Sequence, residues 1–253
     1  MYTPADRSAL RDALVARARA DARITGAALT GSAAVGAEDE WSDIDLAFGL
    51  AADADQSDTV ADWTSTMYAE HGAIHHTDVW SGRTIYRVFL LDSTLQVDIA
   101  FAPSGAFGAL GPTFHLLFGE AVEQPAGSSP KPVDLIGMGW LYALHARSSI
   151  ARGKAWQAEY MISGVRDHVL MLACLRHGVP HSQGRGLHLL PTATTAAVEP
   201  TLVRSLDTAE LLRACRASVD VLLAEASLVD ADLAVRLDPP LRALTTVLAG
   251  CGW

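Results

Sequence analysis

Three aspartates in apolar, strand-like segments are the residues of this sequence best suited to chemistry. Asp43 and Asp45 flank Ile44, and Asp98 lies in a second apolar segment much later in the chain. Because side chains alternate across a strand, Asp43 and Asp45 project from one face while Ile44 enters the core. At about 5.5 Å and an effective dielectric of about 20, two such carboxylates repel by roughly 3 kcal/mol. A divalent cation would remove that cost.

The third carboxylate completes a set of oxygen donors. Asp98 alternates with apolar neighbours, so it is displayed from the sheet surface, and it joins Asp43 and Asp45 if the two strands are neighbours. Oxygen donors on rigid strands suit magnesium that also binds substrate phosphates. Two such ions can activate an attacking hydroxyl and stabilise the leaving oxygen. We therefore predict that Asp43, Asp45 and Asp98 bind two Mg²⁺ ions.

A turn earlier in the chain is suited to phosphate binding. Gly31 and Ser32 follow the apolar stretch 27–29, and a short helix is expected over 32–35. Glycine permits close approach of the backbone to an anion, and amides at a helix start point toward it. We expect Gly31 and Ser32 to bind the β- and γ-phosphates of a nucleotide.

These motifs, in this order, resemble a known family. Leu29-Thr30-Gly31-Ser32, ten residues before Asp43-Ile44-Asp45-Leu46, resembles the signature of the DNA polymerase beta nucleotidyltransferase superfamily. Val97-Asp98-Ile99 resembles the strand of that family that carries the third carboxylate. The layout of such a domain before a helical half is similar to that of the aminoglycoside and lincosamide antibiotic nucleotidyltransferases.

The resemblance implies an enzyme that transfers NMP, commonly AMP from ATP, onto a hydroxyl of a small acceptor and releases pyrophosphate. It implies that Asp43 and Asp45 hold both metals, that Asp98 holds the catalytic metal, and that Ser32 binds the terminal phosphates. An antibiotic acceptor, and hence a role in antibiotic resistance, follows from the resemblance alone. The general base is left open between Asp98 and a carboxylate of the helical half.

A polar stripe in the second half supplies candidates for that carboxylate. Glu159, Ser163 and Arg166 share one helix face, and Lys154 lies one turn before them. In one interpretation Lys154 or Arg166 binds the triphosphate, and Glu159 serves as base toward the acceptor hydroxyl. In the other, the stripe is an exposed face with an ordinary salt bridge.

Hydrophobic periodicity predicts an α/β (α+β) protein in which a mixed sheet with flanking helices precedes an all-helical bundle. The expected strands are 27–29, 41–50, 74–80, 84–91 and 95–101, and the expected helices are 4–22, 56–71, one from 133, one from 156, 207–226 and 231–249. The run 123–132 is rich in Pro, Gly and Ser, as linkers are. We expect a catalytic domain over 1–122 and a helical domain over 133–253. The rings of Trp63, Trp80, Trp140 and Trp156 are expected in the cores.

Composition narrows the function classes. The 253 residues are 50% hydrophobic and carry a net charge of -10, with Lys131 and Lys154 as the only lysines, which argues against nucleic-acid binding. Cys174, Cys215 and Cys251 form no CxxC pair, and the charged start does not resemble a signal peptide. We expect reduced thiols and a cytoplasmic protein that does not enter membranes. The sequence is compatible with a monomer or an oligomer.

Two other functions fit the same motifs. One is AMP transfer onto a partner protein in a toxin-antitoxin type system, which predicts complex formation. The other is a nucleotide-binding module without turnover. The presence of Asp43, Asp45 and Asp98 together favours catalysis.

Overall fold

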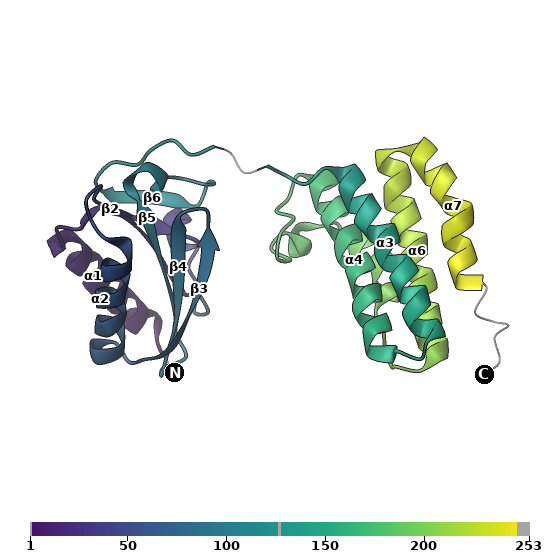
Figure 1. Ribbon diagram of the computed structural model, residues 1–253, viewed down its shortest axis with the longest axis horizontal. Helices are drawn as coiled ribbons and strands as arrows, with labels where there is room; N and C mark the ends of the chain where they lie inside the picture. The colour runs from purple at the N-terminus through teal and green to yellow at the C-terminus, as the bar shows by residue number, and fades with distance from the viewer. Residues whose placement is uncertain (1, 126–127, 247–253) are drawn as a thin grey trace. The chain divides into compact units, whose positions relative to one another are not determined.

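The computed structural model describes residues 2–125 and 128–246. Its contacts divide the chain into two compact units, Met1–Ser128 and Ser129–Trp253. The first is a mixed sheet with helices, and the second is helical, as Figure 1 shows. The predicted α+β class is confirmed. None of the helices in the described residues is long and apolar enough to cross a membrane.

A six-stranded mixed sheet forms the frame of the first unit. Its strands are β1 (Ile24–Thr30), β2 (Ile44–Leu50), β3 (Ala73–Ser81), β4 (Thr84–Leu91), β5 (Gln96–Pro103) and β6 (Phe114–Phe118). Their order is β3-β4-β5-β2-β1-β6. β2 and β5 pair in parallel, whereas the other neighbouring strands pair antiparallel. Two strands far apart in sequence thus meet at the centre of the sheet.

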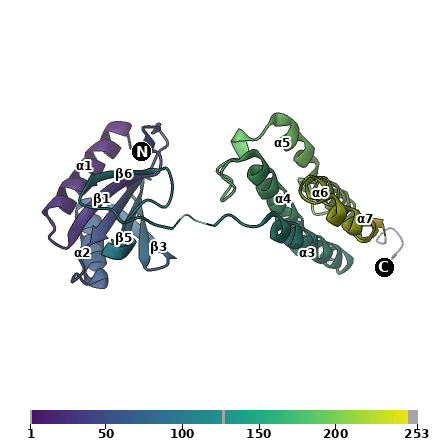
Figure 2. The ribbon, with the colours of Figure 1, turned by 90° about the horizontal axis from the view of Figure 1, so that it is seen from above.

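Two helices, α1 (Pro4–Ala20) and α2 (Gln56–Glu70), cover one face of this sheet (Figures 1 and 2). Thr3 and Asp6 form a capping box at the start of α1, at the predicted helix start. In the core beneath the helices, the Phe48 ring lies 4.8 Å from that of Trp63 and 5.8 Å from that of Phe101. Burial of these aromatic side chains fixes which face of β2 and β5 points inward.

The opposite face of the sheet is lined by small residues. Ala28, Ala47 and Ala100 lie there around the buried Phe107. A Cβ added to Gly26 or Gly49 would lie 2.6 Å or 2.7 Å from the Phe107 ring. The ring therefore sits directly against the backbone of β1 and β2, where no side chain fits.

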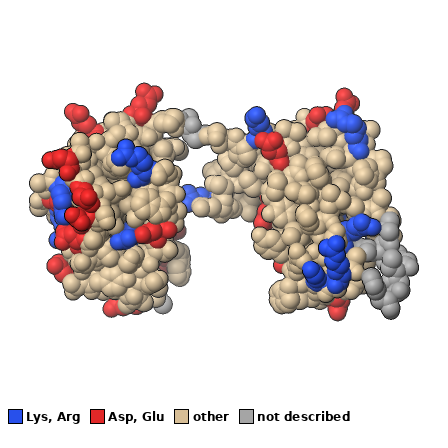
Figure 3. Space-filling view, in the orientation of Figure 1, with Lys and Arg blue, Asp and Glu red and all other residues tan. Residues whose placement is uncertain are grey.

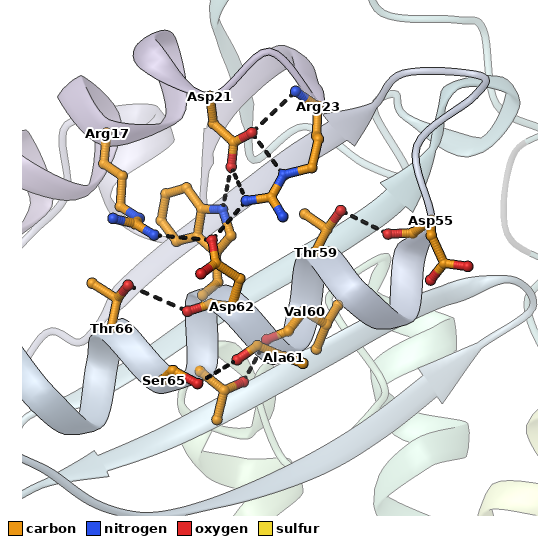
Figure 4. A network of polar contacts seen from close by, with 12 residues as sticks. Arg17, Asp21, Arg23, Asp55, Thr59, Val60, Ala61, Asp62, Ser65 and Thr66 are labelled. Carbon is orange, nitrogen blue, oxygen red and sulfur yellow. Dashed lines mark hydrogen bonds and ion pairs between the residues drawn. The ribbon is translucent and has the colours of Figure 1, made fainter.

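A polar network fastens the end of α1 and the start of β1 to α2 (Figure 4). The Asp21 carboxylate accepts hydrogen bonds from Arg23 Nε at 2.9 Å, from Arg23 Nη2 at 2.7 Å and from Trp63 Nε1 at 3.0 Å. Asp62 accepts from Arg23 at 2.7 Å and from Arg17 at 3.2 Å. The hydrogen bonds that Asp21 accepts, first those from Arg23 and then that from Trp63, lower the pKa of Asp21 to about 2.

The second unit is built on four long helices, α3 (Pro132–Ala151), α4 (Ala155–His177), α6 (Thr208–Val229) and α7 (Ala231–Thr246), with the short α5 (Thr192–Val198) between α4 and α6 in the chain. Glycines bring the helices close together, because a Cβ at Gly139 would lie 2.7 Å from Leu222 and one at Gly164 would lie 2.5 Å from Tyr142. Arg176 of α4 pairs with Glu225 of α6 at 2.7 Å.

Several predictions about elements and side chains need correction. β2 begins at Ile44 rather than residue 41, and neither β6 nor α5 was expected. Trp80 and Trp156 are 60% and 76% exposed, so neither is a core residue, whereas Trp63 is fully buried. Cys174 and Cys215 are buried free thiols, as expected, while Cys251 and the expected helix end at 247–249 lie outside the described residues.

Candidate active site

The parallel pairing of β2 and β5 brings two of the predicted carboxylates together. Asp45 and Asp98 are register partners on these adjacent strands. Their neighbours Leu46 and Ile99 belong to the core beneath the helices, so Asp45 and Asp98 project from the opposite face. Two segments about fifty residues apart in the sequence therefore place acidic side chains side by side.

The third carboxylate is linked to this pair through an amide. Asp43 lies directly before β2, and its Oδ2 accepts a hydrogen bond from Gln96 Nε2 at 3.4 Å. The same Gln96 nitrogen donates to Asp98 Oδ1 at 3.0 Å. Gln96 was not singled out from the sequence, although its position two residues before Asp98 puts both on one strand face. Its amide bridges two like charges.

The loop before Asp43 is held against α1. The buried Arg7 donates through Nη1 to the carbonyl oxygens of Asp39 and Ser42. Arg11 donates to Glu38 at 2.8 Å. These bonds fix the path of the chain into β2 and hence the position of Asp43.

Desolvation makes the charged form of Asp98 costly. Burial raises the pKa of Asp98, the hydrogen bond from Gln96 opposes that rise, and the nearby charge of Asp43 adds to it. A partly buried carboxylate beside another carboxylate is an arrangement that a cation would stabilise. The electrostatics of the site therefore favour a positively charged ligand.

The backbone of β1 ends in contact with this acidic group. Gly31 has a φ of +60°, and a Cβ added there would lie 1.9 Å from Asp45 Oδ2. Only glycine allows this approach, because any side chain would occupy the position of the carboxylate. Ser32 follows at the start of a 3-10 turn, η1 (Ala33–Val35), which is shorter than the predicted helix. The predicted phosphate turn and the predicted metal ligands thus adjoin.

The donor set fits Mg²⁺ in kind, since all three side chains are carboxylates, the hard oxygen ligands that this ion prefers. In the described part of the chain, no three His, Cys, Asp or Glu side chains form a ready-made metal site. Between Asp43 and Asp98 the structure instead has the Gln96 amide, which donates to both. A metal bound by these two carboxylates would take the place of that amide bridge.

Comparisons with known proteins add one finding. No family model matches the chain, and no curated protein does. Among solved structures it is similar to the crystal structure of an aminoglycoside 6-adenyltransferase from Bacillus subtilis. The TM-score is 0.42 and the identity 11%, over 93% of this chain and 97% of that one.

The predicted polar stripe in the second unit is a connected chain of hydrogen bonds. Ser163 Oγ donates to Glu159 Oε1 at 2.6 Å and accepts from Arg166 Nη2 at 2.7 Å. No direct ion pair joins Glu159 to Arg166 in the described residues, so the salt bridge of the alternative interpretation is replaced by this hydroxyl relay. Lys154 precedes α4 and is exposed.

Charged side chains elsewhere are mixed in sign. On the face drawn in Figure 3, Lys and Arg lie among Asp and Glu on the surface of each unit. Most of the visible surface is uncharged. On this face the described Lys and Arg side chains of each unit form no continuous basic track.

Proposed function

We propose that this chain is a magnesium-dependent nucleotidyltransferase that moves NMP, AMP from ATP in the first instance, onto a hydroxyl of a small molecule and releases pyrophosphate. The observation that supports this most directly is the register pairing of Asp45 with Asp98 on parallel strands, next to Asp43. Grouping three carboxylates costs electrostatic free energy, and a bound divalent cation would offset that cost.

In this proposal Asp43, Asp45 and Asp98 hold the metal. Two Mg²⁺ ions bound there would supply Lewis-acid stabilisation of the charge that develops on the phosphate and on the attacking and leaving oxygens. Gly31 lets the end of β1 approach the Asp45 carboxylate closely, and in this proposal the Ser32 hydroxyl that follows donates a hydrogen bond to a phosphate. These residues orient the nucleotide for in-line attack.

The acceptor hydroxyl must lose a proton during the transfer. Asp98 and Glu159 are the two candidate bases, and Lys154 is a candidate cation for the triphosphate. Arg166, the other cation expected there, lines an apolar cavity of the second unit. An antibiotic acceptor, of the aminoglycoside or lincosamide kind, is the first class to test, because the acidic chain suits a cationic substrate.

Pyrophosphate release tests this proposal. The chain is incubated with Mg²⁺, each of the four NTPs and a panel of aminoglycosides and lincosamides, and the products are identified by mass. We expect an acceptor-dependent release with a mass gain of one NMP, abolished in Asp45→Asn. ATP binding without turnover across the panel and across a cell lysate contradicts the proposal and favours the non-catalytic module. A labelled protein in the lysate favours the protein AMP-transferase.

A further inference from the structure

An open cavity lies in the second unit and is lined by residues of that unit alone. It has a volume of about 460 Å³ and is bounded by residues of α4, α5 and the two 3-10 turns η3 (Leu187–Leu189) and η4 (Glu199–Thr201). Its apolar wall consists of Leu170, Leu187, Ala196, Val198 and Leu202. A mostly apolar cavity of this size with few polar groups is typical of small-molecule sites.

One cation faces this apolar wall. Arg166 lines the cavity and is half-buried, and it donates hydrogen bonds to Ser163 Oγ at 2.7 Å and to the Thr201 carbonyl oxygen at 3.5 Å. Within the described residues no carboxylate lies within 4 Å of its nitrogens. A guanidinium has five N–H donors in a planar fork, so donors remain for a bidentate anion.

The carboxylates near Arg166 leave its charge available. Glu159 reaches it only through the Ser163 hydroxyl. Glu199 also lines the cavity but is exposed, so water screens its charge more than that of the half-buried Arg166. The net preference of the cavity is therefore for an anion placed on the arginine.

We propose that this cavity binds a small amphipathic molecule with an apolar body and one anionic group, a carboxylate or sulfonate, held by Arg166. The apolar body lies against the leucine-rich wall, and the anion accepts hydrogen bonds from the guanidinium. This site is independent of the proposed nucleotidyl transfer. It gives Arg166 a ligand other than the triphosphate.

Two fluorescent probes with the same body test the two halves of the proposal. 8-Anilinonaphthalene-1-sulfonate has the anion, whereas N-phenyl-1-naphthylamine lacks it. Both are titrated into the whole chain without nucleotide or Mg²⁺. We expect saturable binding of both, with the sulfonate bound more tightly.

Variants assign the binding to this cavity. Arg166→Gln is expected to weaken the sulfonate about 10-fold, as loss of a charge-assisted hydrogen bond does, and the neutral probe less than about 2-fold. Arg152→Gln is the matched control, since Arg152 is exposed in the same unit and does not line the cavity. Equal loss of both probes in Arg166→Gln, or loss of neither, overturns the assignment of the anion.

Filling the cavity tests its location. Ala196→Trp is expected to remove binding of both probes, whereas Ala193→Trp, on the same short helix but outside the cavity lining, leaves it unchanged. Melting temperatures within a few degrees of the parent show that each variant is folded. Wild-type binding in Ala196→Trp overturns the site. Displacement of the sulfonate by ATP also overturns the proposed site, because it would mean that Arg166 binds the triphosphate.

Discussion

Asp45 of β2 and Asp98 of β5 occupy matching register positions on two adjacent parallel strands, and both side chains face away from the helices. This arrangement destabilises the pairing of β2 with β5, because like charges directly opposite each other repel. Gln96 offsets part of the cost by donating to Asp98 and Asp43. This grouping of carboxylates therefore lowers the stability of the first unit, and the proposed metal would offset that cost.

Replacing Asp98 by Asn should separate stability from function. Asp98→Asn removes a partly desolvated charge beside Asp43, so the melting temperature in EDTA should stay equal or rise. NMP transfer should fall at least ~100-fold, because even indirect partners of a metal site contribute about 10–100-fold. Mn²⁺ titration followed by electron paramagnetic resonance should show weaker binding. Unchanged Mn²⁺ affinity would contradict the metal assignment.

Two glycines with similar positive φ values allow the effect of backbone conformation to be distinguished from the effect of contact with Asp45. Gly31 and Gly36 have φ values of +60° and +67°, but only Gly31 lies against Asp45, while a Cβ at Gly36 meets nothing within 4 Å. Alanine at either position should cost about 1–2 kcal/mol for the left-handed conformation. Gly31→Ala should in addition displace the Asp45 carboxylate and abolish transfer, whereas Gly36→Ala should keep it. Equal activities in the two variants would show that the contact with Asp45 is unimportant.

The Asp21 network should make stability depend on pH. The pKa of Asp21 is lowered from 3.8 to about 2 in the folded chain. Its contribution, roughly 2 kcal/mol, is fully present above pH 4 and is lost as the pH falls through the folded value. Urea unfolding should thus show Asp21→Asn less stable than the parent at pH 7, with the difference shrinking toward pH 2.

Asp53 provides the control for this measurement. It is exposed, and the described residues give it no hydrogen bond or ion pair. Asp53→Asn should therefore leave the unfolding midpoint unchanged at both pH values. A pH-independent loss in Asp21→Asn would mean that the carboxylate acts by shape rather than by charge.

Two glycines near the start of α3 should respond oppositely to alanine. A Cβ at Gly139 would lie 2.7 Å from the fully buried Leu222 of α6, whereas one at Gly137 would meet only Trp140 Nε1, at 3.9 Å. Gly139→Ala should destabilise the chain by about 1–3 kcal/mol through overpacking. Gly137→Ala should stabilise it by up to ~1 kcal/mol through helix propensity. Thermal unfolding measures both, and stabilisation by both would show that α3 and α6 are not in close contact.

The sequence alone was sufficient to predict features that depend on a single helix or strand. The strand predicted over 84–91 has the bounds of β4, and the first helix begins at residue 4, as predicted. Spacing also indicated that Asp45 and Asp98 leave the core. Each of these depends on backbone geometry within a few residues, which repeats every two residues in a strand and every 3.6 in a helix.

Only the tertiary structure decided which elements meet. Asp98 adjoins Asp45 because β5 lies beside β2. This pairing joins segments about fifty residues apart, and no local periodicity of the sequence specifies it. The short β6 is stabilised by β1 rather than by its own pattern, and the Gln96 bridge exists because two strand starts are neighbours. The cavity beside Arg166 likewise forms where α4 packs against α5 and its flanking turns. No sequence pattern links the residues that line it.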